Sequence, residues 1–371
     1  MRLRFIFFFL LLSFCSLAQS YYMFVGTYTS NGSKGIYVYR FDAATGKASW
    51  VSNTDSAANP SYLTVAPDLK YVYAVNEVGG GGSGQVSAFS FDRATGKLSL
   101  INQQSSGGAD PCYVSVTRGG EWVFVANYSG GSLAAFPVNK DGSLQPYAQL
   151  IQDTGSGINK ERQERAHVHS AVLSPDQNYL FSADLGTDKE TIYKLNTTAE
   201  QPLQPATVPF VMIKKGSGPR HLTFHPNKKF AYLIEELSGT VEFYKYNSGT
   251  LTFVQRVATH PADYKGTPGS ADVHVSPDGR FLYASNRGDE NNITIFSINQ
   301  NNGQLRLKGY QSTMGITPRN FAIDPTGHYL VVANQKSDNV VVFKRNAQTG
   351  LLQPTGSVLK VPSPVCLQFA K

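Results

Sequence analysis

Cysteine is scarce in this sequence. Only 3 of the 371 residues are Cys. Cys15 falls in an apolar N-terminal segment, which leaves Cys112 and Cys366 for the folded part of the chain. Two cysteines do not make a disulfide framework, and the repeat described below puts them on different strands. We therefore interpret both as small apolar residues of the interior.

Long apolar runs and basic blocks are also missing. After the first 18 residues, no apolar run approaches the ~20 residues that a membrane-spanning helix needs. The formal net charge is +7, but no Lys/Arg-rich block carries it, so we expect no nucleic-acid partner. The four glycines at 79–82 lack the Lys-Ser/Thr ending of a phosphate-binding loop.

The first 18 residues have the layout of a secretory signal peptide. Arg2 and Arg4 form a basic start, an apolar run covers residues 5–12, and small residues follow. A membrane anchor is the alternative interpretation, but the run is too short to span a bilayer. We predict that residues 1–18 are removed and that residues 19–371 form a single exported domain, periplasmic or secreted, without a stable membrane anchor. Losing both arginines lowers the net charge to +5, which still suits an anionic small molecule.

The sequence does contain a repeated segment that is rich in Tyr and Phe. It has an apolar alternating strand, a turn such as Pro-Asp-Gly, and an aromatic-rich strand that ends in Asn, Asp or Glu. The copies cover residues 60–76, 111–127, 168–184, 219–235, 270–286 and 318–334. A partial copy at 21–27 lacks the first strand.

Two more strands follow each copy, and the units repeat every 48–57 residues. Thr-Gly or Asp-Gly turns separate these outer strands, at 45–46, 95–96, 141–142 and 349–350. Four antiparallel strands per unit is the pattern of a propeller blade. We therefore predict an all-β, seven-bladed β-propeller with four antiparallel strands per blade. A solenoid or a two-sheet sandwich is the alternative, which the four-strand period disfavours.

The C-terminal segment supplies the strand that the first blade lacks. Residues 364–369 resemble 219–224, the opening strand of another copy. We expect them to pair with the strand at 21–27, so that the first blade is closed by the C-terminal strand. Closure of the ring removes the long exposed edge that an open stack would leave.

Opposed residues in an antiparallel pair have a constant sum of sequence numbers. With the turn at 226–229, this rule places Arg220 opposite Glu235. Applied to the other copies, the rule gives the pairs Ser61–Asn76, Cys112–Asn127, His169–Asp184, Ala271–Asn286 and Arg319–Asn334. We expect these residues, and those that follow each second strand, at one mouth of the central channel, with the Pro-Asp-Gly turns at the other.

Four residues at this rim are candidates for catalysis. His169 can take or give a proton near neutral pH, although it could instead be a histidine packed against the channel wall. Arg220 and Arg287 can grip an anion or stabilise an oxyanion, and Glu236 can act as a base or orient the others. The alternative role for the arginines is a salt bridge to Glu235 or Glu236.

Five further rim residues are candidates for substrate binding: His167, Asp184, Arg319, Asn127 and Glu77. His167 points to the same face as His169, because side chains two residues apart on a strand do. With Asp184 these histidines suggest a metal site, but no third His or Cys joins them, and we expect no metal. Asn127 belongs to a set of Asn residues repeated in register, most of which we expect to be structural.

The whole mature sequence resembles the lactonase-type seven-bladed propellers, which include bacterial propeller-type 6-phosphogluconolactonase and fungal carboxy-muconate cyclase. The motifs that carry the resemblance are Glu161-Arg162-Gln163 with His167-x-His169, Asp184-Leu185-Gly186-x-Asp188, Gly218-Pro219-Arg220-His221 with Glu236-Leu237, Ser285-Asn286-Arg287-Gly288, and Ala333-Asn334-Gln335 with Ser337-Asp338. The resemblance implies an active site of His169, Arg220, Glu236 and Arg287. The sequence departs from the family pattern at Tyr113, Glu235 and Asp272, where His, Asn and Glu are expected.

The resemblance and the rim together predict a hydrolase that opens a sugar lactone, 6-phospho-D-glucono-1,5-lactone or a related aldonolactone, to the acid. His169 or Glu236 would activate water, Arg220 would stabilise the oxyanion, and Arg287 would hold the anionic group of the substrate. Ester hydrolysis needs no cofactor. The alternatives are a muconate-type cycloisomerase or lyase, and a non-catalytic secreted propeller that binds a protein or glycan. We expect a monomer or a weak dimer.

Overall fold

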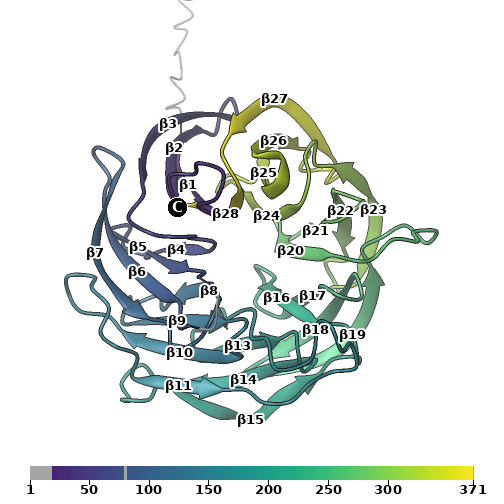
Figure 1. Ribbon diagram of the computed structural model, residues 1–371. Helices are drawn as coiled ribbons and strands as arrows, with labels where there is room; N and C mark the ends of the chain where they lie inside the picture. The colour runs from purple at the N-terminus through teal and green to yellow at the C-terminus, as the bar shows by residue number, and fades with distance from the viewer. Residues whose placement is uncertain (1–18, 79–81, 371) are drawn as a thin grey trace, which may run out of the picture.

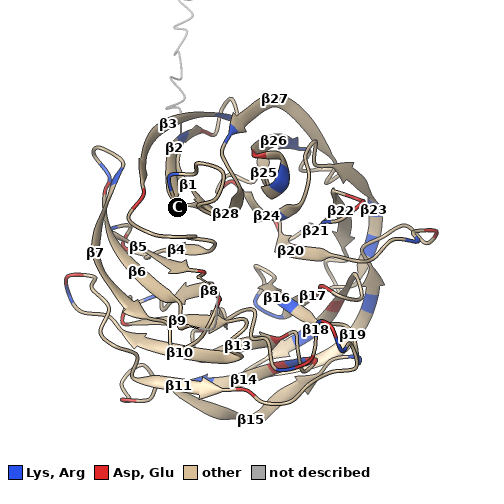
Figure 2. Cartoon of the chain, in the orientation of Figure 1, with Lys and Arg blue, Asp and Glu red and all other residues tan. Residues whose placement is uncertain are grey.

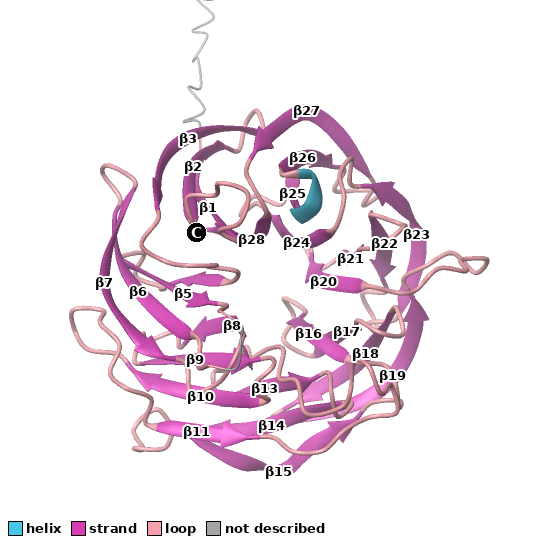
Figure 3. Cartoon of the chain, viewed as in Figure 1, coloured by secondary structure: helices cyan, strands magenta, loops and turns pink. Residues whose placement is uncertain are grey.

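The computed structural model describes residues 19–78 and 82–370. Seven four-stranded antiparallel sheets stand around a central axis (Figure 1). Strands dominate the fold, and the short 3-10 helix η1 (Gln335–Ser337) follows β25 (Figure 3). The predicted leader, residues 1–18, lies outside the described residues. Within the described part, no helix has the length and apolar character needed to cross a membrane.

The first four blades occupy the N-terminal part of the ring, and the strands of each blade run in order from the central axis outward. Blade 1 contains β28 (Pro364–Phe369), β1 (Ser20–Thr27), β2 (Ile36–Asp42) and β3 (Lys47–Thr54). Blade 2 contains β4 (Leu63–Val65), β5 (Tyr71–Asn76), β6 (Gln85–Asp92) and β7 (Lys97–Ser105). Blade 3 contains β8 (Pro111–Val116), β9 (Trp122–Asn127), β10 (Ser132–Pro137) and β11 (Gln149–Gln152). Blade 4 contains β12 (Val172–Leu173), β13 (Tyr179–Asp184), β14 (Lys189–Leu195) and β15 (Leu203–Met212).

The last three blades complete the ring in the same order. Blade 5 contains β16 (Pro219–Phe224), β17 (Phe230–Glu235), β18 (Thr240–Asn247) and β19 (Thr250–Ala258). Blade 6 contains β20 (Ser270–Val275), β21 (Phe281–Asn286), β22 (Asn292–Ile298) and β23 (Leu305–Ser312). Blade 7 contains β24 (Pro318–Ile323), β25 (Tyr329–Asn334), β26 (Asn339–Arg345) and β27 (Leu352–Lys360). The prediction of a seven-bladed propeller with four strands per blade is confirmed.

The two ends of the described chain meet in blade 1. Strand β28 pairs antiparallel with β1, with Val25 opposite Leu367 and Met23 opposite Phe369. In Figure 1 the purple and yellow ends of the chain therefore lie side by side. The prediction that the C-terminal strand closes the first blade is confirmed, and this closure leaves no inner-strand gap in the ring.

The hydrophobic cores lie between adjacent blades, where the second and third strands are buried. Tyrosines of second strands link one blade to the next, because their hydroxyls donate to glycine carbonyls in the turn between the third and fourth strands of the following blade. The three bonds are Tyr73 to Gly142 (3.2 Å), Tyr232 to Gly303 (2.8 Å) and Tyr283 to Gly350 (2.8 Å). Each bond satisfies a buried phenol and ties neighbouring blades together. Cys112 and Cys366 are free and buried, as expected.

The register of the inner hairpins differs from the constant-sum prediction. In blade 5, Pro219 pairs with Glu235 and His221 pairs with Ile234, so Arg220 has no opposed partner. The same irregularity leaves out Cys112 in blade 3, Arg319 in blade 7, and both Ala271 and Asp272 in blade 6. In blade 4, Val168 rather than His169 bridges to Asp184.

These irregularities are β-bulges at the mouth that the sequence predicted to be functional. The predicted pairings of Arg220, Cys112, Ala271, Arg319 and His169 are therefore wrong by one residue. A bulge inserts an extra residue, which a constant sum cannot accommodate, and it re-aims the side chain of that residue. Blades 3, 5, 6 and 7 thus each contain at least one residue near this mouth that is released from the ladder.

Candidate active site

A cavity of about 260 Å³ opens at the mouth formed by the strand ends. Its lining comes from six blades and one loop: Glu77, Cys112, Tyr128, Arg162, His169, Glu236, Arg287 and Arg319. Positions far apart along the chain meet there because the ring brings the inner-strand ends of different blades together. Basic and acidic segments are interspersed around the ring, with both signs close together near β16 and β17 (Figure 2).

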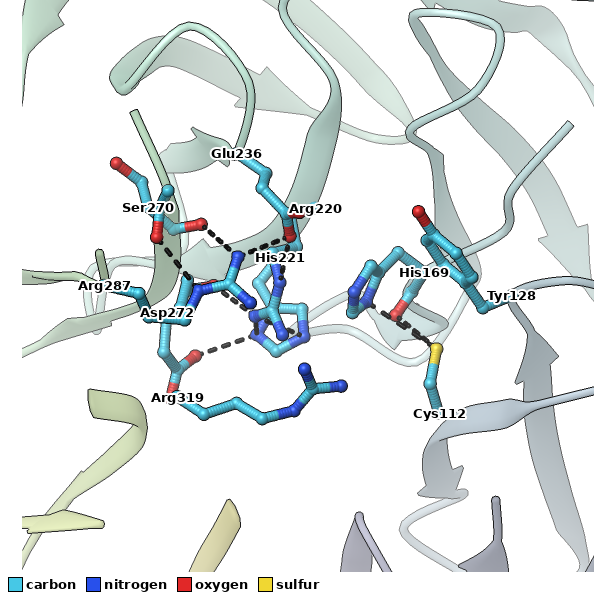
Figure 4. A network of polar contacts seen from close by, with 12 residues as sticks. Cys112, Tyr128, His169, Arg220, His221, Glu236, Ser270, Asp272, Arg287 and Arg319 are labelled. Atoms are coloured by element: carbon cyan, nitrogen blue, oxygen red, sulfur yellow. Dashed lines mark hydrogen bonds and ion pairs between the residues drawn. The ribbon is translucent and has the colours of Figure 1, made fainter. Parts of the chain in front are cut away.

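Glu236 is the centre of the charged network (Figure 4). Its Oε1 accepts from Arg162 Nη2 at 2.6 Å, and its Oε2 accepts from Arg220 Nε at 3.0 Å and lies 2.8 Å from Arg287 Nη2. Burial alone would raise the pKa of Glu236, but the charges of Arg287 and Arg220 outweigh it and hold the pKa well below its usual value. Glu236 is therefore ionised, and both of its oxygens are engaged.

Glu235, the neighbouring carboxylate, faces away from this cavity. It is fully buried, and Arg256 Nη2 donates to its Oε1 at 3.1 Å. Burial and the nearby Glu242 carboxylate raise the pKa of Glu235 to about 7. Of the two adjacent glutamates, only Glu236 lines the cavity of the described residues.

His169 is buried on the opposite wall of the cavity. Cys112 Sγ lies 3.7 Å from its Nδ1, and the Tyr128 ring meets it edge-on at 5.3 Å. Burial and the positive charge of Arg220 lower the pKa of His169 well below its usual value. The imidazole is therefore neutral at physiological pH and keeps one nitrogen able to accept a proton.

Arg220 lies behind Glu236 rather than on the cavity surface. Only 2% of the residue is exposed, and its Nη1 donates to the Ala271 carbonyl and contacts the His221 ring at 3.3 Å. Burial and the neighbouring guanidiniums of Arg287 and Arg319 lower the pKa of Arg220 to about 10. It remains a cation at neutral pH, held by Glu236.

Arg319 and Glu77 lie together in the wall of the cavity. Arg319 Nη2 lies 3.9 Å from Glu77 Oε2, and the Arg319 guanidinium stands over the Tyr28 ring at 5.6 Å. Tyr28 donates to Glu77 Oε1 at 2.8 Å, while Glu77 Oε2 has no hydrogen-bond partner within the described residues. The cavity wall thus carries the Arg319 cation, which Glu77 balances only at long range.

Three of the predicted binding residues lie outside this cavity. Asp184 is buried in its strand-end turn, where it accepts from the backbone N–H of His167 at 2.7 Å and of Gly186 at 2.9 Å. The side-chain amide of Asn127 donates to the Ser106 carbonyl at 2.9 Å. The His167 ring stacks on Tyr128 at 4.5 Å. These contacts stabilise the loops of the mouth, and a direct role in binding stays a prediction.

Three cavity residues were not selected from the sequence: Cys112, Tyr128 and Arg162. Tyr128 follows a second strand, as Glu236 and Arg287 do, so its rim register could have indicated it. Arg162 belongs to one of the motifs that resemble the lactonase-type propellers. It lies in a loop outside the repeated segments, so the repeat could not predict its position in the cavity. Cys112 occupies a bulge. Among the residues that the structure describes, no cluster of three or more His, Cys, Asp or Glu has the geometry to hold a metal ion.

A family model described as "Lactonase, 7-bladed beta-propeller" matches residues 22–369, nearly all of the described chain. This protein belongs to the lactonase family of seven-bladed propellers. The resemblance inferred from its motifs is thereby confirmed.

Several members of the lactonase family are similar over their full length. A 6-phosphogluconolactonase of Formosa agariphila is 42% identical, over 94% of this chain and 99% of that protein. A solved structure from Bacteroides fragilis has 44% identity and a TM-score of 0.91, and covers 95% of this chain and 98% of that one. The periplasmic gluconolactonase of Pseudomonas aeruginosa has 41% identity and a TM-score of 0.90, over 95% and 99% of the two chains.

Proposed function

We propose that this protein hydrolyses a sugar lactone of the 6-phosphogluconolactone type, opening the ring ester to the aldonic acid. The observation that carries the proposal is a neutral, buried imidazole facing a cluster of guanidiniums across a cavity of about 260 Å³. Lactone hydrolysis needs a proton acceptor for water and cations for the developing oxyanion. The muconate-type and non-catalytic alternatives are not favoured, since relatives with full-length similarity are named for lactone hydrolysis.

His169 is the proposed general base. It removes a proton from a water molecule whose oxygen attacks the lactone carbonyl carbon, and a tetrahedral oxyanion forms. Collapse of this intermediate breaks the bond from that carbon to the ring oxygen, and the His169 imidazolium returns the proton to the leaving alkoxide. Glu236 is the weaker candidate for the base, because both of its oxygens already accept from arginines and its pKa is held low.

The guanidiniums at the site differ in whether they are bonded to Glu236. Arg162, Arg220 and Arg287 are held by Glu236, whereas Arg319 makes a longer ion pair with Glu77, at 3.9 Å. Arg319 is the guanidinium best placed to meet the oxyanion or an anionic substituent. Glu77 lines the same cavity and stays a predicted substrate-binding residue.

The proposal is tested by acid release in a pH-stat, with δ-gluconolactone and its 6-phosphate as alternative substrates. We expect turnover of at least one of them above spontaneous hydrolysis, and a loss of at least about a hundredfold in kcat for His169→Gln. His328→Gln is the matched control, because His328 is exposed at the opposite mouth. Spontaneous rates with both lactones for the wild-type protein would overturn the proposal, and the ratio of the two substrates decides whether a phosphate is recognised.

We also propose that the protein is exported. The support is the basic and apolar leader at residues 1–18 together with the similarity to a periplasmic gluconolactonase. Cell fractionation with mass spectrometry of the mature N-terminus should find a chain that starts close to residue 19 outside the cytoplasm. A full-length chain confined to the cytosolic fraction would contradict export.

A further inference from the structure

The side of Arg220 that faces away from Glu236 is held by the blade next to its own. Arg220 is on β16, and its Nη1 donates to the carbonyl of Ala271 on β20. The Nδ1–H of the adjacent His221 donates to the Asp272 carboxylate at 2.9 Å. One bulge of β20, between Ser270 and Val273, therefore supplies both the carbonyl and the carboxylate.

Asp272 connects four inner strands. Besides His221 on β16, its carboxylate accepts from the side-chain amide of Asn320 on β24 at 2.6 Å and lies 2.9 Å from His274 Nε2 on β20. The side-chain Oδ1 of Asn320 in turn accepts from the backbone N–H of Leu367 on β28 at 2.7 Å. Burial opposes its ionisation, yet the neighbouring His274 and His221 hold the pKa of Asp272 well below its usual value.

His221 forms part of the partition between the two ends of the channel. A second cavity, of about 560 Å³, opens toward the turns of the inner hairpins, and His221, Asp272 and His274 are among its lining residues. The stacked rings of Tyr62 and Tyr113 stand beside His221, at 5.9 and 5.3 Å. Arg220 and His169 also contact the His221 ring (Figure 4).

His221 is uncharged at physiological pH. Burial and the Arg220 charge lower the pKa of His221 to about 4, although Asp272 opposes the shift. The groups that face it are Arg220, His169, Asp272 and the two tyrosines, with His274 beyond Asp272. A neutral ring bonded to Asp272 can lie against a guanidinium without repelling it.

We propose that His221 and Asp272 form a positioning unit, which fixes the Arg220 guanidinium from behind and through it holds Glu236 and the arginines of the cavity in place. The inference rests on the proposed lactonase function for its activity readout. Neither residue touches the substrate cavity, so their effect passes through Arg220. A small displacement of charged groups at a reacting centre is costly, about a hundredfold in rate for 1 Å.

The test compares His221→Asn and Asp272→Asn with His274→Gln. His274 bonds the same carboxylate but is directed to the other cavity, with 34% of its side chain exposed. We expect kcat/KM for the lactone to fall at least tenfold in the first two variants and less than twofold in the control. Melting temperatures should fall by similar amounts in His221→Asn and His274→Gln, since each loses one bond to Asp272, and by more in Asp272→Asn, whose carboxylate bonds His221, His274 and Asn320.

A double-mutant cycle separates positioning from a structural role. In a protein that already carries Arg220→Lys, adding His221→Asn should lower kcat/KM by less than threefold, because the guanidinium that His221 positions is no longer present. If the loss of kcat/KM in the double variant equals the product of the losses in the two single variants, the proposal is overturned. If either Asn variant fails to fold, the other carries the cycle, and two misfolded Asn variants beside a folded control would also overturn it.

A second readout does not depend on catalysis. The Arg220 Nε–H is buried against Glu236, so its hydrogen exchange in ¹⁵N NMR should be slow in the wild type and in His274→Gln, and much faster in His221→Asn. If the wild type turns over no lactone, the proposed function fails, and this exchange alone decides the positioning unit. Unchanged exchange in His221→Asn would refute it.

Discussion

Glu236 is the residue on which the charges of the site depend. Three guanidiniums approach one carboxylate whose side chain is only 6% exposed. Charges this close are stable together only while the carboxylate is ionised, because otherwise the arginines repel one another without compensation. The residue therefore combines two roles that sequence reasoning treats separately, a cavity residue and an anchor for its neighbours.

Glu236→Gln should therefore destabilise the fold as well as the activity. We expect a loss of about 3–5 kcal/mol in unfolding free energy at neutral pH, the usual cost of breaking a buried ion pair from one side. Denaturant unfolding at pH 7 measures this loss. Arg280→Gln is a suitable control, since Arg280 is exposed and bonds only backbone carbonyls near the opposite mouth.

The destabilisation by Glu236→Gln should depend on pH in one direction. The folded protein lowers the pKa of Glu236, so ionisation stabilises the fold above the unfolded value of about 4.3, and this contribution is lost as the pH falls through the folded value. The difference between wild type and variant should be constant from pH 6 to 8 and shrink in strongly acidic solution. A difference that grew on acidification would contradict the assignment.

At the scale of elements, the turns between third and fourth strands lock one blade to the next. The turn at Gly350 in blade 7 shows the geometry: its φ is +78°, and an added Cβ would stand 2.3 Å from Phe281 Cδ1 of blade 6. Its carbonyl also accepts the Tyr283 hydroxyl. A side chain is therefore excluded by both backbone conformation and packing.

Gly350→Ala should destabilise the protein by about 2–4 kcal/mol, the sum of a left-handed alanine and an overpacked contact. Gly356 provides a matched control, with φ +81° and no atom within 4 Å of an added Cβ. Gly356→Ala should cost only the backbone part, about 1–2 kcal/mol. Chemical denaturation of both variants measures the difference, and equal losses would show that the interblade contact contributes nothing.

The elements also show what the sequence could predict. Strands, turns and blade number follow from hydrophobic alternation and Gly-containing turns, which are local and repeat seven times. Bulges such as the one at Arg220 are one-residue insertions into a ladder, with no signature in the alternation, so the predicted pairings slipped by one. The error of one residue in the pairing is small compared with the length of a strand. The prediction therefore still placed the following residues at one mouth of the channel: His169, Glu236, Arg287, Arg319 and Glu77.

The repeat pattern could not predict that the loop residue Arg162 lies at the site. It follows β11, in a part of the chain outside the repeated segment, and it reaches Glu236 of the next blade but one. Only the curvature of the complete ring brings these two side chains within 2.6 Å. Repeats predict what each blade contributes, whereas contacts between blades depend on closure.

At the scale of the whole molecule, closure depends on six residues. In β28, Val365, Cys366, Leu367 and Phe369 are at most 7% exposed, and they pack against β1 and β24. Burial of a large apolar side chain is worth about 1.5–3 kcal/mol, so Val365, Leu367 and Phe369 together contribute an amount comparable with the total stability of a typical domain, about 5–15 kcal/mol. Asn320 and the Leu367 backbone also tie this strand to Asp272 and the site.

Truncation after Ser363 should therefore unfold the ring rather than fray one blade. We expect loss of the cooperative thermal transition in calorimetry and loss of lactone turnover together. A permuted chain that carries residues 364–370 ahead of residue 19 supplies the control, because Ala370 already donates to the Tyr22 carbonyl and a short turn can join the two strands. It restores every described strand of blade 1 but removes the covalent connection between blades 7 and 1, so it should fold and melt below the wild type. A truncated chain that melts like the wild type would show that the other six blades are stable without closure, and the site would then be independent of the chain ends.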